Sequence, residues 1–313
     1  MSNLFVKKSI SLLMSHAEDS EKNLKKTLTA TSLIALGIGA IIGAGLFVRT
    51  AAAAAQNAGP SVTIGFIIAA IGCALAGLCY AELSSSIPIA GSAYTYSYAT
   101  MGELVAWMIG WDLVLEYAVG AATVGIAWAE YLNNLLTNVL HLPPIPYEWC
   151  HSPFEMSVSG VHGIINLPAL FIVSLLSLLL IRGTHESAIV NNLIVVAKVT
   201  IVILIIATGW HFINPANHAV YIPEPSVYVD HQGISHSYGG IMGILGAAGV
   251  VFFAFIGFDA VSTAAQEAKN PERDMPIGIL GSLVICTVLY ILFAHVLTGV
   301  ASVEDFRTTG KEA

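Results

Sequence analysis

Charged residues are scarce in this sequence, and their scarcity excludes most classes of soluble protein. Only 10% of the 313 residues are Asp, Glu, Lys or Arg, whereas a soluble domain carries roughly 25%. The shortage of charge excludes a disordered chain, and the net charge of −8 excludes a nucleic-acid binder, which needs a basic surface. Since 56% of the residues are hydrophobic and the mean hydropathy is +0.77, the composition predicts an integral membrane protein.

The sequence also lacks the motifs of enzyme and metal chemistry. No Ser/His/Asp signature stands out, and no histidine spacing matches a metal site. The four cysteines are typical of small apolar fillers, because Cys73, Cys79 and Cys286 lie in apolar stretches and Cys150 is isolated in a loop. We therefore expect no enzymatic activity, no cofactor and no metal ion.

Long apolar runs, by contrast, are abundant. A helix that crosses roughly 30 Å of hydrocarbon needs about 20 mostly apolar residues, and short alternating segments typical of a barrel do not appear. Because lipid offers no partner to backbone groups, the fold is expected to be all-α and polytopic. The seven predicted spans are residues 31–55, 61–86, 104–138, 163–181, 190–213, 239–264 and 277–301.

The distribution of Lys and Arg predicts a cytoplasmic N-terminus. With the N-terminus inside, eight of these residues lie on the inner side, three lie on the outer side, and Lys198 lies within a span. The inner set is Lys7, Lys8, Lys22, Lys25, Lys26, Arg182, Lys269 and Arg273, and the outer set is Arg49, Arg307 and Lys311.

The first span is rich in glycine, with Gly37, Gly39, Gly43 and Gly45 falling within nine residues. Small residues four positions apart allow close helix packing, and this interpretation stays open. Gly43 and Gly45, however, face different sides of a helix and both weaken it, which indicates a break. A break exposes N–H groups at membrane depth, which is tolerated beside a cavity and attracts a carboxylate.

The sixth span has a matching irregularity. Gly246, Gly249 and Gly257 interrupt a run of aromatic residues. An unwound segment from Phe253 to Phe258 would present carbonyl oxygens suited to an ammonium group. Two interrupted spans at corresponding places in two halves of a chain indicate a transporter site between inverted repeats. N–H donors on the first span and carbonyl acceptors on the sixth span suit a zwitterion, which has both a carboxylate and an ammonium group.

Three ionisable residues lie within predicted spans, where charge is costly and usually functional. Glu116 lies about 18 Å into the third span, where it either serves the site or bonds a neighbouring helix. Asp112, one turn earlier, is expected to be a packing partner. Lys198 lies about 9 Å deep and either snorkels to the interface or contacts carbonyls of the broken first span. In the second case it can release and regain a proton as the site opens.

Four segments carry a family resemblance. They read AIIGAGLFV (40–48), YAELSSSIPIAGSAYTYSYATMGELVAWMIGWDLVLEY (80–117), NNLIVVAKVTIV (191–202) and FFAFIGFDAVSTAAQEAKNPERDMPIGI (252–279). From about residue 25 to residue 300 the chain resembles the amino-acid permeases of the amino acid–polyamine–organocation superfamily. Within that superfamily it is most similar to the cationic amino-acid transporter branch and its bacterial relatives.

The resemblance implies a fold of two inverted five-helix repeats that works by alternating access. Ammonium-binding carbonyls fall on Phe253, Ala254 and Ile256, a proton-linked lysine falls on Lys198, and an acidic residue near the substrate falls on Glu116. The family often has Thr or Ser where this chain has Ala44, so one side-chain hydroxyl is missing. The carboxylate-binding backbone falls on Ile41, Ile42, Gly43, Ala44 and Gly45.

We therefore expect a proton-coupled amino-acid permease of the plasma membrane, which would be the inner membrane of a bacterium. Its partners are an amino acid and the lipid bilayer, with no nucleic acid, and a proton gradient is its driving force. Phe255 and Phe258 are candidates for an aromatic gate or a side-chain wall. Since no strongly acidic pocket beyond Glu116 is visible, small neutral amino acids or a broad range of amino acids are favoured over cationic ones.

The expected organisation follows the two repeats. A cytoplasmic tail (1–29) precedes the first five-helix repeat (30–213), an outer loop (214–238), the first two helices of the second repeat (239–301) and a tail (302–313). Because the resemblance implies at least ten spans, the chain is expected to be truncated after its seventh. The alternative is a non-transporting fragment or an amino-acid-binding module. The particular amino acid, symport versus exchange, and the oligomeric state stay open.

Overall fold

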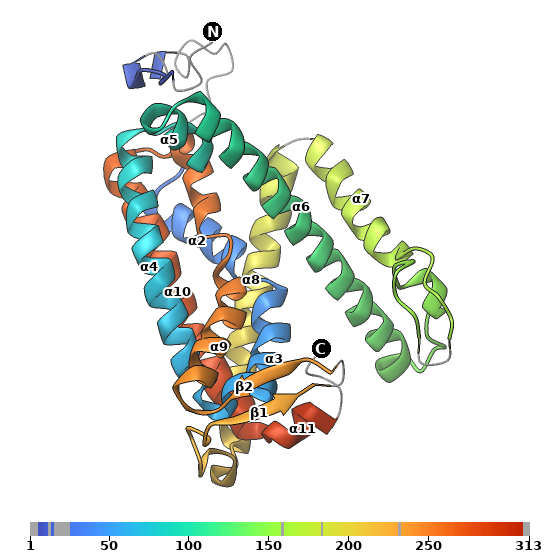
Figure 1. Cartoon of the computed structure of the whole chain (residues 1–313). Coiled ribbons are helices and arrows are strands. Elements are labelled where there is room, and N and C mark those ends of the chain that lie inside the picture. The colour runs from blue at the N-terminus through green and yellow to red at the C-terminus, as the bar shows by residue number, and fades with distance from the viewer. Residues whose placement is uncertain are drawn as a thin grey trace. The chain divides into compact units, whose positions relative to one another are not determined.

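The computed structural model describes residues 6–11, 14–15, 26–157, 160–182, 184–230 and 233–308, which are mostly helical (Figure 1). In chain order the helices are α2 (Ala30–Ile41), α3 (Thr50–Ala53), α4 (Val62–Ser86), α5 (Ser92–Thr100), α6 (Glu103–Asn134), α7 (Leu167–Arg182), α8 (Thr184–Gly209), α9 (Gly240–Phe252), α10 (Pro271–Val300) and α11 (Val303–Thr308). The expectation of an all-α polytopic membrane protein is confirmed.

Short π and 3-10 segments continue several of these helices. The π-helical segments are Gly45–Arg49, Ala54–Ala58 and Leu135–Val139. The 3-10 segments are Gly59–Ser61, Tyr147–Trp149, Trp210–Phe212, Pro215–His218, Phe253–Phe255 and Asp259–Glu267. Strands β1 (Ser226–Val229) and β2 (Ser235–Tyr238) form one antiparallel hairpin, in which Ser226 lies opposite Tyr238.

The predicted spans correspond to these elements. Among the described residues, five helical stretches are long and apolar enough to cross a membrane, and Ala30–Ile41 and Leu167–Ile181 are shorter apolar helices. The first of the five, Gly45–Ser86, turns at Gly59, where φ is +57°. Helix α10 begins at Pro271, six residues before the predicted start of the last span, because Pro271 suits the first turn of a helix. In that turn Asp274 accepts a hydrogen bond of 3.1 Å from the Asn270 N–H.

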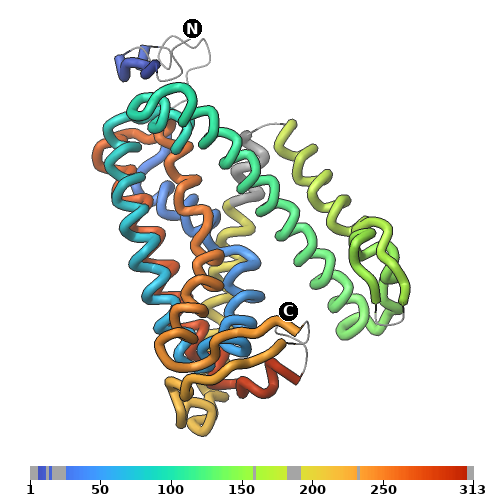
Figure 2. The backbone as a smooth tube through the Cα atoms, viewed as in Figure 1, coloured from blue at the N-terminus to red at the C-terminus, as the bar shows by residue number. Residues whose placement is uncertain are grey.

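Packing divides the chain into two compact units, Met1–Trp107 with Asn192–Ala313, and Met108–Asn191. In the first unit α10 packs against α4 and α2, and α4 also packs against α9 (Figures 1 and 2). On the opposite side of α4, Ile71 and Leu75 are 58% and 63% exposed, as expected for side chains that face lipid. In the second unit Gly125 of α6 lies against Ala169 and Val173 of α7.

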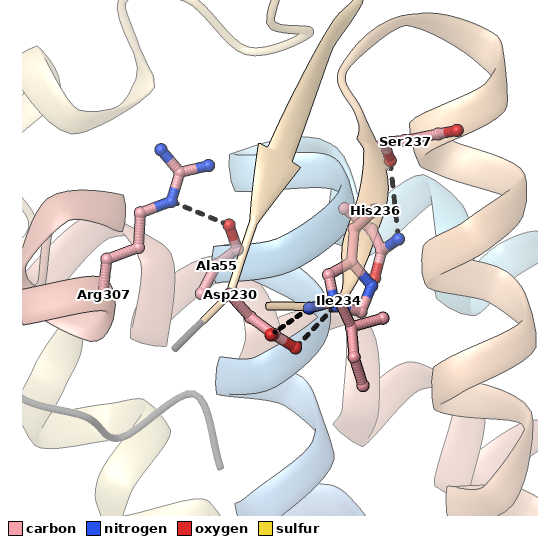
Figure 3. Close-up of polar contacts among 7 residues, drawn as sticks. Ala55, Asp230, Ile234, His236, Ser237 and Arg307 are labelled. Atoms are coloured by element: carbon pink, nitrogen blue, oxygen red, sulfur yellow. Dashed lines mark hydrogen bonds and ion pairs between the residues drawn. The ribbon is translucent and has the colours of Figure 1, made fainter. Parts of the chain in front are cut away.

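The outer loop predicted at residues 214–238 contains the hairpin, which its own side chains close (Figure 3). Asp230 accepts a 2.8 Å bond from the Ile234 N–H and lies 2.9 Å from His236 Nε2. These bonds link the end of β1 to the start of β2.

Arg307 of α11 attaches this hairpin to the end of the first span. Its Nε donates to the Ala55 carbonyl at 2.9 Å, and its guanidinium carbon lies 4.1 Å and 4.4 Å from the ring centres of Tyr228 and Tyr238. The Asn57 side-chain amide also donates to the Ser237 carbonyl at 3.4 Å. A cation between two aromatic faces is a favourable arrangement.

The structure changes the interpretation of one positive charge. Arg49 counts as an outer-side residue in the sequence, but the helical path continues beyond it through Ala58. At 1.5 Å per residue, Arg49 lies about 14 Å before that end. Arg49 therefore lies inside Gly45–Ser86, a helical stretch long and apolar enough to cross a membrane, and its assignment to the outer side stays a prediction. Lys22, Lys25, Lys311 and the side chain of Arg182 lie outside the described residues.

Candidate functional site

The first span is broken where the glycines predict it. Helix α2 ends at Ile41, Ile42 has an extended backbone (φ −73°, ψ 99°), and the π-helical segment begins at Gly45. A Cβ added at Gly43 would meet no atom within 4 Å, whereas one at Gly45 would lie 2.8 Å from Ala254 Cα. Gly43 therefore borders open space, and Gly45 allows the two backbones to touch.

Close helix packing occurs at Gly37 and not at Gly43, which is one of the two glycines four positions apart that predicted it. A Cβ at Gly37 would lie 2.6 Å from the Ser282 Cβ of α10. Gly37 therefore serves helix packing, while Gly43 and Gly45 belong to the break. Helix packing and the helix break therefore involve different glycines of the first span.

The sixth span is broken at the predicted aromatic run. The 3-10 segment ends at Phe255, Ile256 is extended (φ −55°, ψ 134°), and Gly257 has φ +114°. Only glycine adopts that backbone readily, and a Cβ there would also lie 2.7 Å from the Ala40 carbonyl oxygen. The two breaks thus touch twice, through Gly257 against Ala40 and through Gly45 against Ala254.

Tyr290 of α10 joins the two breaks. Its hydroxyl lies 2.9 Å from the Ile41 carbonyl and 3.0 Å from the Ala254 carbonyl. Its ring packs against Phe66 and Phe255, with centroids 5.6 Å and 5.2 Å away. Tyr290 is not among the site residues predicted from the sequence. The available signal was a phenol hydroxyl within an apolar span, because a buried hydroxyl needs a hydrogen-bond partner.

Replacing Tyr290 by Phe is expected to destabilise the protein by about 1–3 kcal/mol. The ring stays in place, but two buried carbonyls lose their shared donor. Thermal melting in detergent measures the effect. Tyr94→Phe is the matched control, because Tyr94 is exposed; equal melting temperatures for both variants would contradict this role.

Lys198 of α8 lies against the end of α2. Its ammonium donates to the Gly39 carbonyl at 2.5 Å and to the Ile42 carbonyl at 2.6 Å. The structure therefore shows the contact with broken span 1 and does not show snorkelling. Helix C-termini carry partial negative charge, which favours a cation at this position. The role of Lys198 in proton coupling stays a prediction.

The two candidate gate residues have different surroundings. Phe255 is fully buried among aromatic rings, 6.2 Å from Phe66 between centroids. Phe258 packs edge-on against Tyr80 at 5.8 Å, and Tyr80 in turn lies 6.3 Å from Tyr96. Phe258 therefore belongs to a row of rings with Tyr80 and Tyr96, and the gate role of both phenylalanines stays a prediction.

Backbone bonds join the residues just before α2 to the end of the sixth span. The Leu28 N–H donates to the Glu267 carbonyl, and the Lys269 N–H donates to the Leu28 carbonyl, both at 2.9 Å. Nearby, the buried Ser262 hydroxyl donates to Ser92 Oγ at 2.9 Å. The two backbone bonds connect the start of α2 to the end of the 3-10 segment Asp259–Glu267, and the serine bond connects that segment to α5.

Glu116 and Asp112 lie on α6 in the second unit, where both are exposed. The broken spans, Tyr290 and Lys198 all belong to the first unit. The place of Glu116 near the substrate therefore stays a prediction, as does the packing role of Asp112.

Two apolar helices that break side by side, with a lysine at one break, define an integral membrane protein built like a transporter core. A family model described as amino acid permease matches residues 28–311. The chain belongs to the amino acid permease family.

Its relatives differ in the compounds that their names state. The chain is 44% identical to the methylthioribose transporter of Bacillus subtilis (strain 168) over 96% of its length and 60% of the relative's. It is 43% identical to the branched-chain amino acid permease BcaP of the same organism, over 97% and 61% of the two chains. It is 41% identical to cationic amino acid transporter 9, chloroplastic, of Arabidopsis thaliana, over 90% and 46%. The chain thus spans about 60% of the two bacterial relatives.

Proposed function

We propose that this chain contains the substrate site of a proton-coupled amino-acid permease that works by alternating access. The observation that carries the proposal is the double break held together by Tyr290, with Lys198 bound to the first of the two breaks. The protein acts in the plasma membrane, the inner membrane of a bacterium, with its N-terminus in the cytoplasm. The five-plus-five repeat is its proposed architecture.

The substrate lies between the two breaks. Its carboxylate meets the amides of Gly43, Ala44 and Gly45, because the first N–H groups of a helix have no partner within that helix. Open space beside Gly43 supports this position. Its ammonium meets carbonyls of the segment Phe253 to Ile256, whose extended residue turns the backbone away from helical bonding.

Lys198 couples protons to this site. When protonated, it holds the Gly39 and Ile42 carbonyls and fixes the end of α2. Loss of the proton leaves a neutral amine, which holds two carbonyls less strongly. The end of α2 is then free to move, and the 3-10 segment Asp259–Glu267 moves with it through the Leu28 bonds. Glu116 completes the proposed set of site residues.

Uptake by proteoliposomes tests the proposal. Labelled L-leucine, L-alanine and L-lysine are supplied with and without an inward proton gradient, and a protonophore serves as the control. Uptake of at least one amino acid should rise with the gradient and fall to background with the protonophore. Uptake that ignores the gradient would contradict proton coupling.

Thermal stabilisation separates transport from binding alone. Stabilisation by an amino acid without uptake would favour the binding module, and neither effect would favour an inert fragment. Methylthioribose is a useful further competitor because of the 44% identity to its transporter. It carries neither a carboxylate nor an ammonium group, so preferential binding of this sugar would overturn the zwitterion site.

A further inference from the structure

Arg49 lies on the side of the first span that faces the second break. It follows Gly45 by four residues in the π-helical segment Gly45–Arg49, and residues four apart share roughly one face of a helix. Gly45 on this face touches Ala254, and the Arg49 guanidinium carbon lies 5.9 Å from the ring centre of Phe253. Arg49 therefore lies about one helical turn, or ~6 Å, beyond the contact between the two breaks.

Few interactions with the rest of the protein stabilise the charge of Arg49. Within the part of the chain that the structure describes, Arg49 makes no ion pair and no hydrogen bond. Its ring contact is at the distance limit of about 6 Å for such interactions. Arg49 is exposed, but it lies within Gly45–Ser86, a helical stretch long and apolar enough to cross a membrane, where a charge is costly and is usually retained for function.

We propose that Arg49 is a charge filter, which admits amino acids with an uncharged side chain and rejects those with a cationic side chain. The inference rests on the substrate site proposed above. The guanidinium lies on the outward side of the two breaks, where it raises the electrostatic potential along the path to the site. The substrate carboxylate tolerates this potential, because it is negative, whereas a second ammonium group is repelled.

The repulsion is large enough to decide selectivity. Two unit charges about 8 Å apart, at an effective dielectric constant near 20, repel by an energy equivalent to about thirtyfold in affinity. A neutral residue at position 49 removes this repulsion for a substrate with a cationic side chain. It leaves the binding of a substrate with a neutral side chain unchanged.

Matched substitutions test the filter. Arg49→Gln and Arg273→Gln each remove one positive charge, and Arg273 is exposed in the first turn of α10. Affinities for L-leucine and L-lysine are measured by thermal stabilisation and by competition against uptake. We expect wild type and Arg273→Gln to prefer leucine. Arg49→Gln should raise the affinity for lysine relative to leucine at least about tenfold.

Two further variants complete the test. Arg49→Met replaces Arg49→Gln if the glutamine variant does not fold, and Arg49→Lys should retain the preference for leucine because it keeps the charge. The filter is overturned if wild type binds lysine as well as leucine. It is also overturned if neutral substitutions at position 49 leave the ratio within twofold. A wild-type protein that binds neither amino acid would instead refute the proposed substrate site.

Discussion

Lys198→Met is expected to lower gradient-driven amino-acid uptake at least about a hundredfold. Methionine keeps an unbranched chain of similar length but has no donor for the Gly39 and Ile42 carbonyls. Hydrogen bonds from a charged group contribute about 1.5–3 kcal/mol each, and every 1.4 kcal/mol is a factor of ten. Loss of both bonds therefore suffices for the expected decrease, and loss of the titratable amine removes the response to pH.

Two measurements separate this effect from misfolding. Exchange of internal for external amino acid needs no net proton movement, so Lys198→Met should retain more exchange than gradient-driven uptake. Lys269→Met is the matched control, because the Lys269 side chain is exposed at the end of the second broken span. If Lys198→Met still responds to the proton gradient as wild type does, Lys198 is not the coupling residue.

Gly45→Ala is expected to destabilise the protein by about 1–3 kcal/mol and to weaken amino-acid binding at least about tenfold. The added Cβ would lie 2.8 Å from Ala254 Cα, and a backbone atom cannot rotate away as a side chain can. The two breaks must therefore separate, which moves the Gly45 amide away from the carbonyls of the second break. Melting temperature and amino-acid-induced stabilisation report the two effects.

Gly249→Ala is the control for this substitution. A Cβ at Gly249 would meet no atom within 4 Å, and alanine favours a helix over glycine by roughly 1 kcal/mol. Gly249→Ala should therefore melt at or slightly above the wild-type temperature. Similar melting and binding of Gly45→Ala and Gly249→Ala would show that the breaks do not depend on their close approach.

The sequence predicts features that depend on local patterns. Span positions follow from apolar run length, and both breaks follow from glycines that no continuous helix favours, such as Gly45 and Gly257. Lys198 was identifiable because a charge within an apolar run needs a partner at depth. The contact of this lysine with the first span was one of two interpretations, and only the structure decided between them.

Features that depend on distant residues were not predictable in the same way. The Tyr290 hydroxyl serves carbonyls of two other spans, and neither partner lies near it in sequence. Arg307 similarly attaches the hairpin to Ala55. The position of Arg49 beside the Phe253 ring was likewise not predictable, because the two residues lie on different spans.

The sequence by itself determined that this protein is helical, lies in a membrane and interrupts two of its spans. Composition and glycine placement suffice for this. An apolar segment in lipid must satisfy its backbone hydrogen bonds internally, which favours a helix, and glycine weakens a helix locally. Only the tertiary structure decided that the two breaks touch, that Tyr290 joins them and that Lys198 binds the first one. These contacts arise when separate helices pack, so no single segment of the sequence encodes them.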